Sequence, residues 1–262
     1  MTGGDSLKPI KADLSKDLEA IEIHPLADLH IGDMSCDFKA ILDELEYIKT
    51  TPNCYCVLDG DLMDTAIASS IGDTYGASHT PMEQLKECVN LFAPIKDKIL
   101  AVEGGNHENR IYKTDGVDIT ELMCHQLGIA DRYSPTTALI FVRFGNDAKH
   151  NRKMCYTVYM THGSGGGRKE GGKINRLADL ATIVDADIYL MAHTHSPAAF
   201  RNCFYRADPR NNNITKTEHL FVNTAAWLRY GGYGDKSGYK PASNINPVIY
   251  LDGRAKEARA LI

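Results

Sequence analysis

Five short polar clusters, each placed directly after an apolar run, constrain the fold of this chain more than any other feature. They are Asp-Leu-His at 28–30, Gly-Asp-Leu-Met-Asp at 60–64, Gly-Asn-His-Glu at 105–108, Thr-His-Gly at 161–163 and His-Thr-His at 193–195. The apolar runs have the length and composition of buried strands. Because functional side chains gather where the strands of an open α/β sheet end, we expect the five clusters to meet at one sheet edge.

The order of the predicted elements indicates an α/β fold. In the first half, strand-like runs at 20–26, 54–58 and 99–103 alternate with helix-like runs at 38–49, 81–92 and 117–127. This alternation favours a partly parallel sheet with helices packed against it. The second half has one helix-like run at 174–184 and strand-like runs at 138–144, 154–160, 188–192, 198–205, 218–223 and 248–251. We therefore predict two stacked mixed β-sheets flanked by helices.

Length and composition are those of a globular protein. A chain of 262 residues can bury about 70 to 75% of its unfolded surface in one core, so we expect residues 20–262 to form a single domain. Residues 1–19 are polar, lack the apolar stretch of a secretory signal peptide and are expected to form a surface extension. No apolar run approaches the roughly 20 residues of a membrane span. Seven cysteines without a CxxC pair favour a reducing, cytoplasmic location.

Charge is distributed unevenly along the chain. Residues 1–131 hold 10 Lys and Arg against 24 Asp and Glu, whereas residues 132–262 hold 19 against 10. The halves therefore carry −14 and +9, which sum to the net charge of −5. Either the halves attract each other across an ordinary fold, or the acidic half supplies metal ligands and the basic half contacts phosphate.

The residue types in the five clusters are those of a metal centre. They offer carboxylate, imidazole and amide oxygen but no sulfur, which suits Mn, Fe or Zn better than Mg or Ca. Two such ions about 3.5 to 4 Å apart can hold a phosphate and lower the pKa of bound water from about 15.7 to about 7. The clusters thus predict a two-metal, phosphoester-cleaving centre. The remaining histidines match no motif and receive no metal role: His24, His79, His125, His150 and His219.

Taken in order, the patterns DxH, GDxxD, GNHE, H and HxH resemble the calcineurin-like metallophosphoesterase superfamily over residues 28–195. The resemblance implies a fold of two mixed sheets sandwiched between helices. It also implies two divalent ions, Mn being favoured and Fe, Zn or Ni the alternatives. One ion would be bound by Asp28, His30, Asp61 and His195, and the other by Asp61, Asn106, His162 and His193. Asp61 would bridge them. His107 would correspond to the catalytic histidine, which protonates the leaving oxygen or contacts the phosphate, and Asp64 would orient it.

The residue after GDxxD bears on the substrate. Protein Ser/Thr phosphatases of this superfamily have an arginine there, and this chain has Thr65. The sequence GDLxD is more similar to phosphodiesterases and to the nuclease subunits of double-strand-break repair complexes, although those commonly have GNHD. We expect a phosphodiesterase acting on a nucleotide or nucleic acid, with DNA or RNA nuclease activity included. The alternatives are a phosphomonoesterase for small phosphates or phosphoproteins, and a binding protein without turnover. No obligatory protein partner and no membrane association are indicated.

Two further segments are candidates for substrate contact. Residues 167–173 satisfy GxxxxGK, but Ile174 lacks the hydroxyl of a true P-loop, so we expect 163–172 to be either a substrate-facing loop with Arg168 and Lys169 near phosphate or a plain surface loop. Residues 222–230 resemble the tail of bacterial and phage-encoded, nuclease-like members of the superfamily. Here Arg229 and Tyr230, with Trp227 and Tyr233, are candidates for gripping phosphates and stacking bases, Trp227 being equally well explained as core. Asn106 is a further candidate contact. The loop at 231–241 would close over the site or mediate subunit contact.

Overall fold

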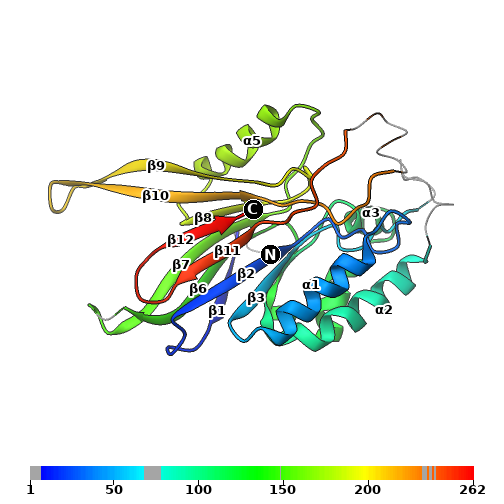
Figure 1. Cartoon of the computed structure of the whole chain (residues 1–262), viewed down its shortest axis with the longest axis horizontal. Coiled ribbons are helices and arrows are strands. Elements are labelled where there is room, and N and C mark those ends of the chain that lie inside the picture. The colour runs from blue at the N-terminus through cyan, green and yellow to red at the C-terminus, as the bar shows by residue number, and fades with distance from the viewer. Residues whose placement is uncertain (1–6, 68–77, 148, 232–234, 236–237, 239) are drawn as a thin grey trace.

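The computed structural model describes residues 7–67, 78–147, 149–231, 235, 238 and 240–262, which form two mixed six-stranded sheets (Figure 1). The first sheet has the order β12-β11-β2-β3-β4-β5, with strands Ala258–Leu261, Val248–Asp252, Ala20–Leu26, Cys54–Asp59, Ile99–Glu103 and Tyr133–Ser134. The second has the order β1-β6-β7-β8-β10-β9, with strands Lys8–Asp13, Thr137–Asp147, Arg152–Thr161, Ile188–Met191, Asn213–Asn223 and Ala198–Asp208. Strands β2 to β5 are parallel, as are β7, β8 and β10, so each set ends at one edge of its sheet.

Helices cover the outer faces of both sheets. They are α1 (Phe38–Thr50), α2 (Pro81–Phe92), α3 (Glu108–Asp115), α4 (Ile119–Leu127) and α5 (Glu170–Asp179), with short 3₁₀ helices at Ala93–Lys98, Ala130–Arg132 and Leu180–Thr182. One apolar cluster joins α1, α2 and α4 to the first sheet, a second fills the space between the sheets, and a third joins α5 to the second sheet. The predicted fold of two stacked mixed sheets flanked by helices is confirmed.

Local sequence signals explain the best-predicted boundaries. Helix α2 begins where Thr80 caps the helix in a capping box with Glu83 and Pro81 occupies the first helical position. Strands β2 and β4 and helix α2 have the predicted limits. By contrast, α5 begins at Glu170, four residues before the predicted start. Gly171 and Gly172 lie within its first turn, and the low helix propensity of glycine is the reason that the sequence indicated a later start. The predicted loop at 163–172 therefore ends at Lys169.

The N-terminal segment differs from the prediction. We expected residues 1–19 to be a surface extension, whereas β1 pairs in parallel with β6 at the edge of the second sheet. Ile10 and Ala12 are buried between exposed residues, which is the alternation of a half-buried strand. The lysines of this strand, at positions 8 and 11, obscured the pattern in the sequence.

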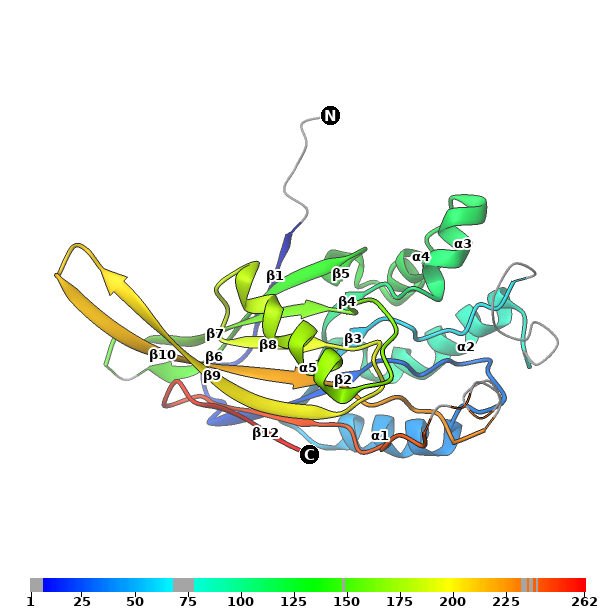
Figure 2. The ribbon, with the colours of Figure 1, turned by 90° about the horizontal axis from the view of Figure 1, so that it is seen from above.

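Two other features extend beyond the predictions. Strands β9 and β10 form a long hairpin that projects from the rest of the molecule (Figure 2). Both strands are longer than predicted because their polar outer ends continue to pair after the apolar residues stop. Helix α3 and strands β5 and β12 were not predicted. Most of the loop predicted at 231–241, including Tyr233, lies outside the described residues.

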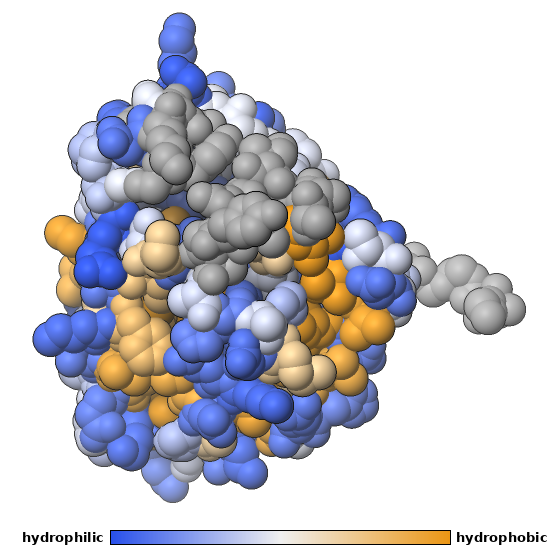
Figure 3. Space-filling model, turned by 90° about the vertical axis from the view of Figure 1, so that its right-hand side faces the viewer, coloured by the Kyte–Doolittle hydropathy of each residue, from blue (hydrophilic) through white to orange (hydrophobic). Residues whose placement is uncertain are grey.

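The described helices include none that is both long enough and apolar enough to cross a bilayer. On the face seen in Figure 3, hydrophilic residues separate two apolar areas.

Tyr156 joins the two sheets at the end away from the polar clusters. Its ring is almost fully buried on β7, and its hydroxyl lies 2.7, 2.8 and 2.9 Å from the carbonyl oxygens of Asp252, Ala255 and Glu257. The same hydroxyl accepts a hydrogen bond from the Glu257 N–H at 2.8 Å. One side chain of the second sheet therefore organises the turn between β11 and β12 of the first.

We predict that Tyr156→Phe lowers the free energy of unfolding by about 0.5 to 1.5 kcal/mol, because the turn between β11 and β12 loses the part-buried hydrogen bonds of the hydroxyl while the ring still fills its space. Urea denaturation measures the change as a lower midpoint at constant slope. Tyr250→Phe, at a half-buried position of β11, is the matched control. Equal midpoints for the two variants would show that the Tyr156 hydroxyl does not stabilise the turn between β11 and β12.

Candidate metal centre

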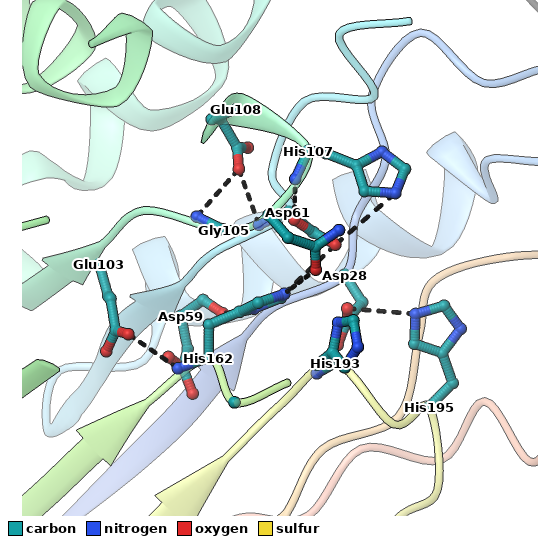
Figure 4. A network of polar contacts seen from close by, with 12 residues as sticks. Asp28, Asp59, Asp61, Glu103, Gly105, His107, Glu108, His162, His193 and His195 are labelled. Carbon is teal, nitrogen blue, oxygen red and sulfur yellow. Dashed lines mark hydrogen bonds and ion pairs between the residues drawn. The ribbon is translucent and has the colours of Figure 1, made fainter. Parts of the chain in front are cut away.

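Five strands deliver ligand-type side chains to one place (Figure 4). Strands β2, β3 and β4 of the first sheet are followed by the clusters at 28–30, 60–64 and 105–108. Strands β7 and β8 of the second sheet are followed by those at 161–163 and 193–195. The parallel strands of both sheets end at the same side of the molecule, so the clusters meet as the sequence predicts. The centre therefore lies across the open end of the two-sheet sandwich.

The loops after β2 and β3 are hydrogen-bonded to each other. The N–H groups of Asp28 and His30 donate to the carbonyls of Gly60 and Asp61, both at 3.0 Å. Ile31 and Met63 then form an isolated bridge. Five candidate ligands, Asp28, His30, Asp61, His193 and His195, have positive φ angles between 48° and 65°. Such angles cost non-glycine residues on the order of 1 to 3 kcal/mol each and persist where the surroundings hold them.

Two glycines permit the close approach of the loops. A Cβ on Gly105 would lie 2.0 Å from the Asp61 nitrogen, and one on Gly60 would lie 2.7 Å from His162 Nδ1. Gly60 also has φ +74°, which favours glycine. These contacts explain why glycine precedes both the Asp and the Asn of the two motifs.

The first ligand group consists of Asp28, His30 and His195, whose donor atoms lie within 4.8 Å of one another. His195 Nε2 is 3.1 Å from Asp28 Oδ1, and the backbone N–H of His193 donates to Asp28 Oδ2 at 3.0 Å. Burial raises the pKa of Asp28, but the adjacent His195 outweighs that effect and the pKa lies below its usual range. Asp28 is therefore an ionised carboxylate with no solvent contact.

The second ligand group consists of Asp61, His162 and His193, again with donor atoms within 4.8 Å. His162 Nε2 lies 3.2 Å from Asp61 Oδ2 and 3.1 Å from Asn106 Oδ1. Its other ring nitrogen, Nδ1, donates to the Asp59 carbonyl at 2.7 Å. That bond fixes the ring and leaves Nε2 directed at the centre, the arrangement usual for a metal-binding histidine.

His30 provides a test of whether these residues fit a metal. Its Nε2 is buried and has no hydrogen-bond partner among the described residues. Burial and the charge of His107 lower the pKa of His30 to about 3, so the imidazole is neutral and its free nitrogen can donate a lone pair. Buried polar atoms rarely lack partners, and a cation held together with Asp28 and His195 would satisfy this one. The donor set therefore fits a divalent ion.

His107 and Asp64 form a pair at the edge of the centre. His107 Nδ1 donates to Asp64 Oδ1 at 3.0 Å and to the Asp64 carbonyl at 2.9 Å. Burial lowers the pKa of His107, but the hydrogen bond to Asp64 and the charge of Asp61 more than compensate, and the pKa is raised. Because Nδ1 keeps its proton against Asp64, Nε2 is the nitrogen that gains or loses one.

Arg110 was not predicted to belong to this site. It lies one turn after His107 on α3, and its Nη2 donates to His107 Nε2 at 2.9 Å. Its Nη1 donates to the Asp64 carbonyl at 3.1 Å. The spacing of three residues on a helix was the available signal, but α3 itself was not predicted.

Glu108 belongs to the GNHE motif but was given no role from the sequence. Its buried carboxylate accepts three backbone N–H bonds, from Met63 at 2.8 Å, Gly105 at 3.0 Å and Asp61 at 3.1 Å. The residue therefore connects the loop after β3 to the loop after β4 (Figure 4). It holds the bridging candidate in place without facing the metal positions itself.

Two buried acids behind the centre were also missed. Asp59 and Glu103 are register partners on β3 and β4. Burial raises the pKa of Asp59 to about 8, and burial together with Asp59 raises that of Glu103. Glu103 Oε1 accepts the His162 N–H at 2.9 Å. Burial therefore favours the protonated form of both acids, whereas Asp28 and Asp61, whose pKa values are lowered, are the buried carboxylates that face the candidate metal positions.

The residues predicted to contact substrate lie on separate segments of the chain. Arg168 and Lys169 are exposed directly before α5, and the exposed Asn106 adjoins the ligand groups. The Arg229 N–H donates to the Ser35 carbonyl at 2.8 Å, and its guanidinium faces the carbonyls of residues 34 and 36. Tyr230 is 55% exposed, with its hydroxyl 3.4 Å from Asp235.

Trp227 is a core residue and does not present a face for base stacking. Only 7% of it is exposed, and its backbone N–H donates to the Asp28 carbonyl at 3.1 Å. This hydrogen bond therefore helps to hold the loop after β2 in place.

No protein-family model matches the sequence, and no curated protein sequence matches it. Several solved structures are similar to this chain, among them the following two. One is a conserved uncharacterised protein from Streptococcus pneumoniae described as a predicted phosphoesterase, with 15% identity, a TM-score of 0.40 and coverage of 93% of this chain and 90% of that chain. The other is Pseudomonas putida nuclease MPE, with 14% identity, a TM-score of 0.36 and coverage of 91% of this chain and 87% of that chain.

We predict that Glu108→Gln weakens metal binding by about 10- to 100-fold although no ligand is removed, because an amide NH₂ would face the backbone N–H groups that position Asp61. The free energy of unfolding should also fall by about 1 to 3 kcal/mol. Competition with a chromogenic chelator measures the affinity, and urea denaturation the stability. Glu121→Gln, at an exposed position of α4, is the control; metal affinity equal in both variants would refute the positioning role.

Proposed function

We propose that this chain is a metal-dependent phosphoesterase of the calcineurin-like metallophosphoesterase superfamily, with two divalent ions and a preference for phosphodiesters, including DNA or RNA. The observation that carries the proposal is the position of Asp61. Its Oδ2 lies 3.2 Å from His162 Nε2 in the second ligand group, its backbone carbonyl accepts the N–H of His30 of the first group at 3.0 Å, and its Oδ1 accepts the backbone N–H of His107 at 2.8 Å. These contacts support a role for the Asp61 carboxylate as the bridge between two ions beside an acid–base histidine.

The ligand set divides between two positions. Asp28, His30 and His195 would hold one ion, and His162, His193 and Asn106 the other, with Asp61 shared. When bound, the two ions would neutralise the phosphate and activate a water molecule as nucleophile. Mn²⁺ is favoured by the mixture of imidazole and oxygen donors, with Fe, Zn or Ni as alternatives.

His107 would serve the leaving group. Asp64 holds the ring through Nδ1, so Nε2, once released from the Arg110 guanidinium, can carry a proton toward the departing oxygen. The raised pKa keeps a larger fraction of the imidazole protonated near neutral pH, as a general acid requires. Arg110, which contacts Nε2, also places a positive charge at the position where the phosphate oxygens would lie.

Position 65 supports a diester over a phosphoprotein substrate. Thr65 is fully buried, its N–H donates to Gln84 Oε1 at 2.8 Å, and its hydroxyl donates to the His107 carbonyl at 2.5 Å. An arginine could not occupy this enclosed position and also reach a substrate. The arginine that protein phosphatases place after GDxxD is thus replaced by a structural residue that supports His107. We expect faster hydrolysis of bis(p-nitrophenyl) phosphate than of p-nitrophenyl phosphate, and the reverse order would favour a monoesterase.

Replacement of His107 separates chemistry from metal binding. We predict that His107→Ala keeps about two ions per chain but lowers kcat for bis(p-nitrophenyl) phosphate by about 10²- to 10⁴-fold, because the proton donor is lost. Metal content is measured by mass spectrometry on the same preparation. Asp61→Ala should instead lose both ions, since one carboxylate serves both positions. Full turnover in His107→Ala, or two retained ions in Asp61→Ala, would overturn the respective role.

Asp64 should set the alkaline limit of activity. The folded pKa of His107 is raised, so its acid form is present below that pKa and is lost as pH rises through it. Asp64→Asn removes the charge that favours the imidazolium but keeps an oxygen for Nδ1. We predict that the decline of kcat at high pH then begins at lower pH, while the acidic side of the profile is unchanged. An unshifted alkaline limit would show that His107 does not act as the acid.

A further inference from the structure

A separate cluster of ligand-type side chains lies at the N-terminal ends of β2 and β3, away from the candidate metal centre. Glu22 and His24 project from the same face of β2, and Cys54 begins β3 as the register partner of Glu22. One donor atom from each of the three lies within 4.8 Å of the others. Glu22 precedes Asp28 by six residues, which in an extended strand is roughly 20 Å. This group is therefore separate from the candidate metal centre.

The orientation of His24 is fixed by α1, which packs over this part of the sheet (Figure 1). Its Nδ1 is hydrogen-bonded to Glu44 Oε1, and its Nε2 lies 3.3 Å from Glu22 Oε2. A carboxylate on one ring nitrogen, with the other nitrogen directed at donor atoms, is the usual environment of a metal-binding histidine. The Tyr47 hydroxyl donates to Glu22 Oε2 at 3.0 Å and so orients the second donor.

The chemistry of the three donors is specific. A thiol, an imidazole and a carboxylate together suit Zn²⁺ and are poorly suited to Mg²⁺ or Ca²⁺. Cys54 is fully buried and His24 nearly so, whereas about a quarter of the Glu22 and Glu44 side chains is exposed. An ion could thus enter from solvent and meet two buried donors. Three protein donors leave a fourth tetrahedral position for water.

We propose that Glu22, His24 and Cys54 form a mononuclear zinc-type site, with Glu44 holding the His24 ring. Binding displaces two protons, that of the Cys54 thiol and that of His24 Nε2, which faces Glu22 Oε2 at 3.3 Å, and the ion then occupies His24 Nε2. The site would join the first residue of β3 to β2 and, through Glu44, to α1. It would therefore stabilise the N-terminal ends of β2 and β3, whose C-terminal ends carry the candidate metal centre.

The cysteine makes the site distinguishable by spectroscopy. The candidate metal centre contains no sulfur, so a thiolate-to-Co²⁺ charge-transfer absorption in the near ultraviolet reports only a cysteine-bound ion. We expect this absorption when metal-free protein is titrated with Co²⁺, and its loss in Cys54→Ser and His24→Gln. Zinc measured after dialysis should fall by one ion per chain in Cys54→Ser. Circular dichroism checks that each variant is folded.

Matched variants decide between this site and the alternatives. Cys88→Ala removes another fully buried cysteine and Cys203→Ser an exposed one, and both should keep the absorption. Asp61→Ala should keep it as well, so failure of the proposed function would leave this test intact. No absorption in the unmodified protein, or an absorption that survives Cys54→Ser, would overturn the proposal and identify the group as a His24–glutamate ion pair.

Discussion

The candidate metal centre depends on the pairing between the loops that continue β2 and β3 beyond the first sheet. Hydrogen bonds from Asp28 to Gly60 and from His30 to Asp61 hold these loops side by side, and Glu108 attaches the loop after β4. The pairing stabilises the positive φ angles that turn Asp28, His30 and Asp61 toward one point. The strain at these three positions thus falls on residues whose direction matters, while no positive φ angle occurs within β2 or β3.

Charge burial is the second constraint. Asp28 and Asp61 are ionised and almost inaccessible, and an isolated buried carboxylate would be strongly unfavourable. His195 and His162 compensate part of this charge in the protein alone. A divalent ion at each position would replace those contacts with stronger ones and would occupy the free nitrogen of His30. The buried carboxylates that destabilise the metal-free protein therefore also favour the binding of cations.

The sequence predicted the architecture and the convergence of the ligands because both depend on short-range patterns. Apolar runs of strand length gave β2 and β4 their limits, and a polar cluster after each parallel strand placed the side chains at one edge. Contributions from residues far apart in the chain could not be predicted in this way. The three backbone bonds of Glu108, the support of Asp28 by Trp227 and the contact of Arg110 with His107 depend on tertiary proximity. Helix α3 escaped prediction because its one buried residue is Glu108, which leaves it without an apolar face.

The division of the ligands between two sheets links metal binding to the packing of the sandwich. Asp28, Asp61 and Asn106 follow strands of the first sheet, whereas His162, His193 and His195 follow strands of the second. Either ion would therefore cross-link the sheets at their open end, and Tyr156 joins them at the other. Between these two points lies the apolar layer of residues such as Ile23, Ile140 and Leu190, which requires no ion. A ligand whose free concentration is 100 times its dissociation constant stabilises the folded state by about 2.7 kcal/mol. Ions bound to residues of both sheets would therefore add stability to a sandwich whose sheets the apolar core already holds together.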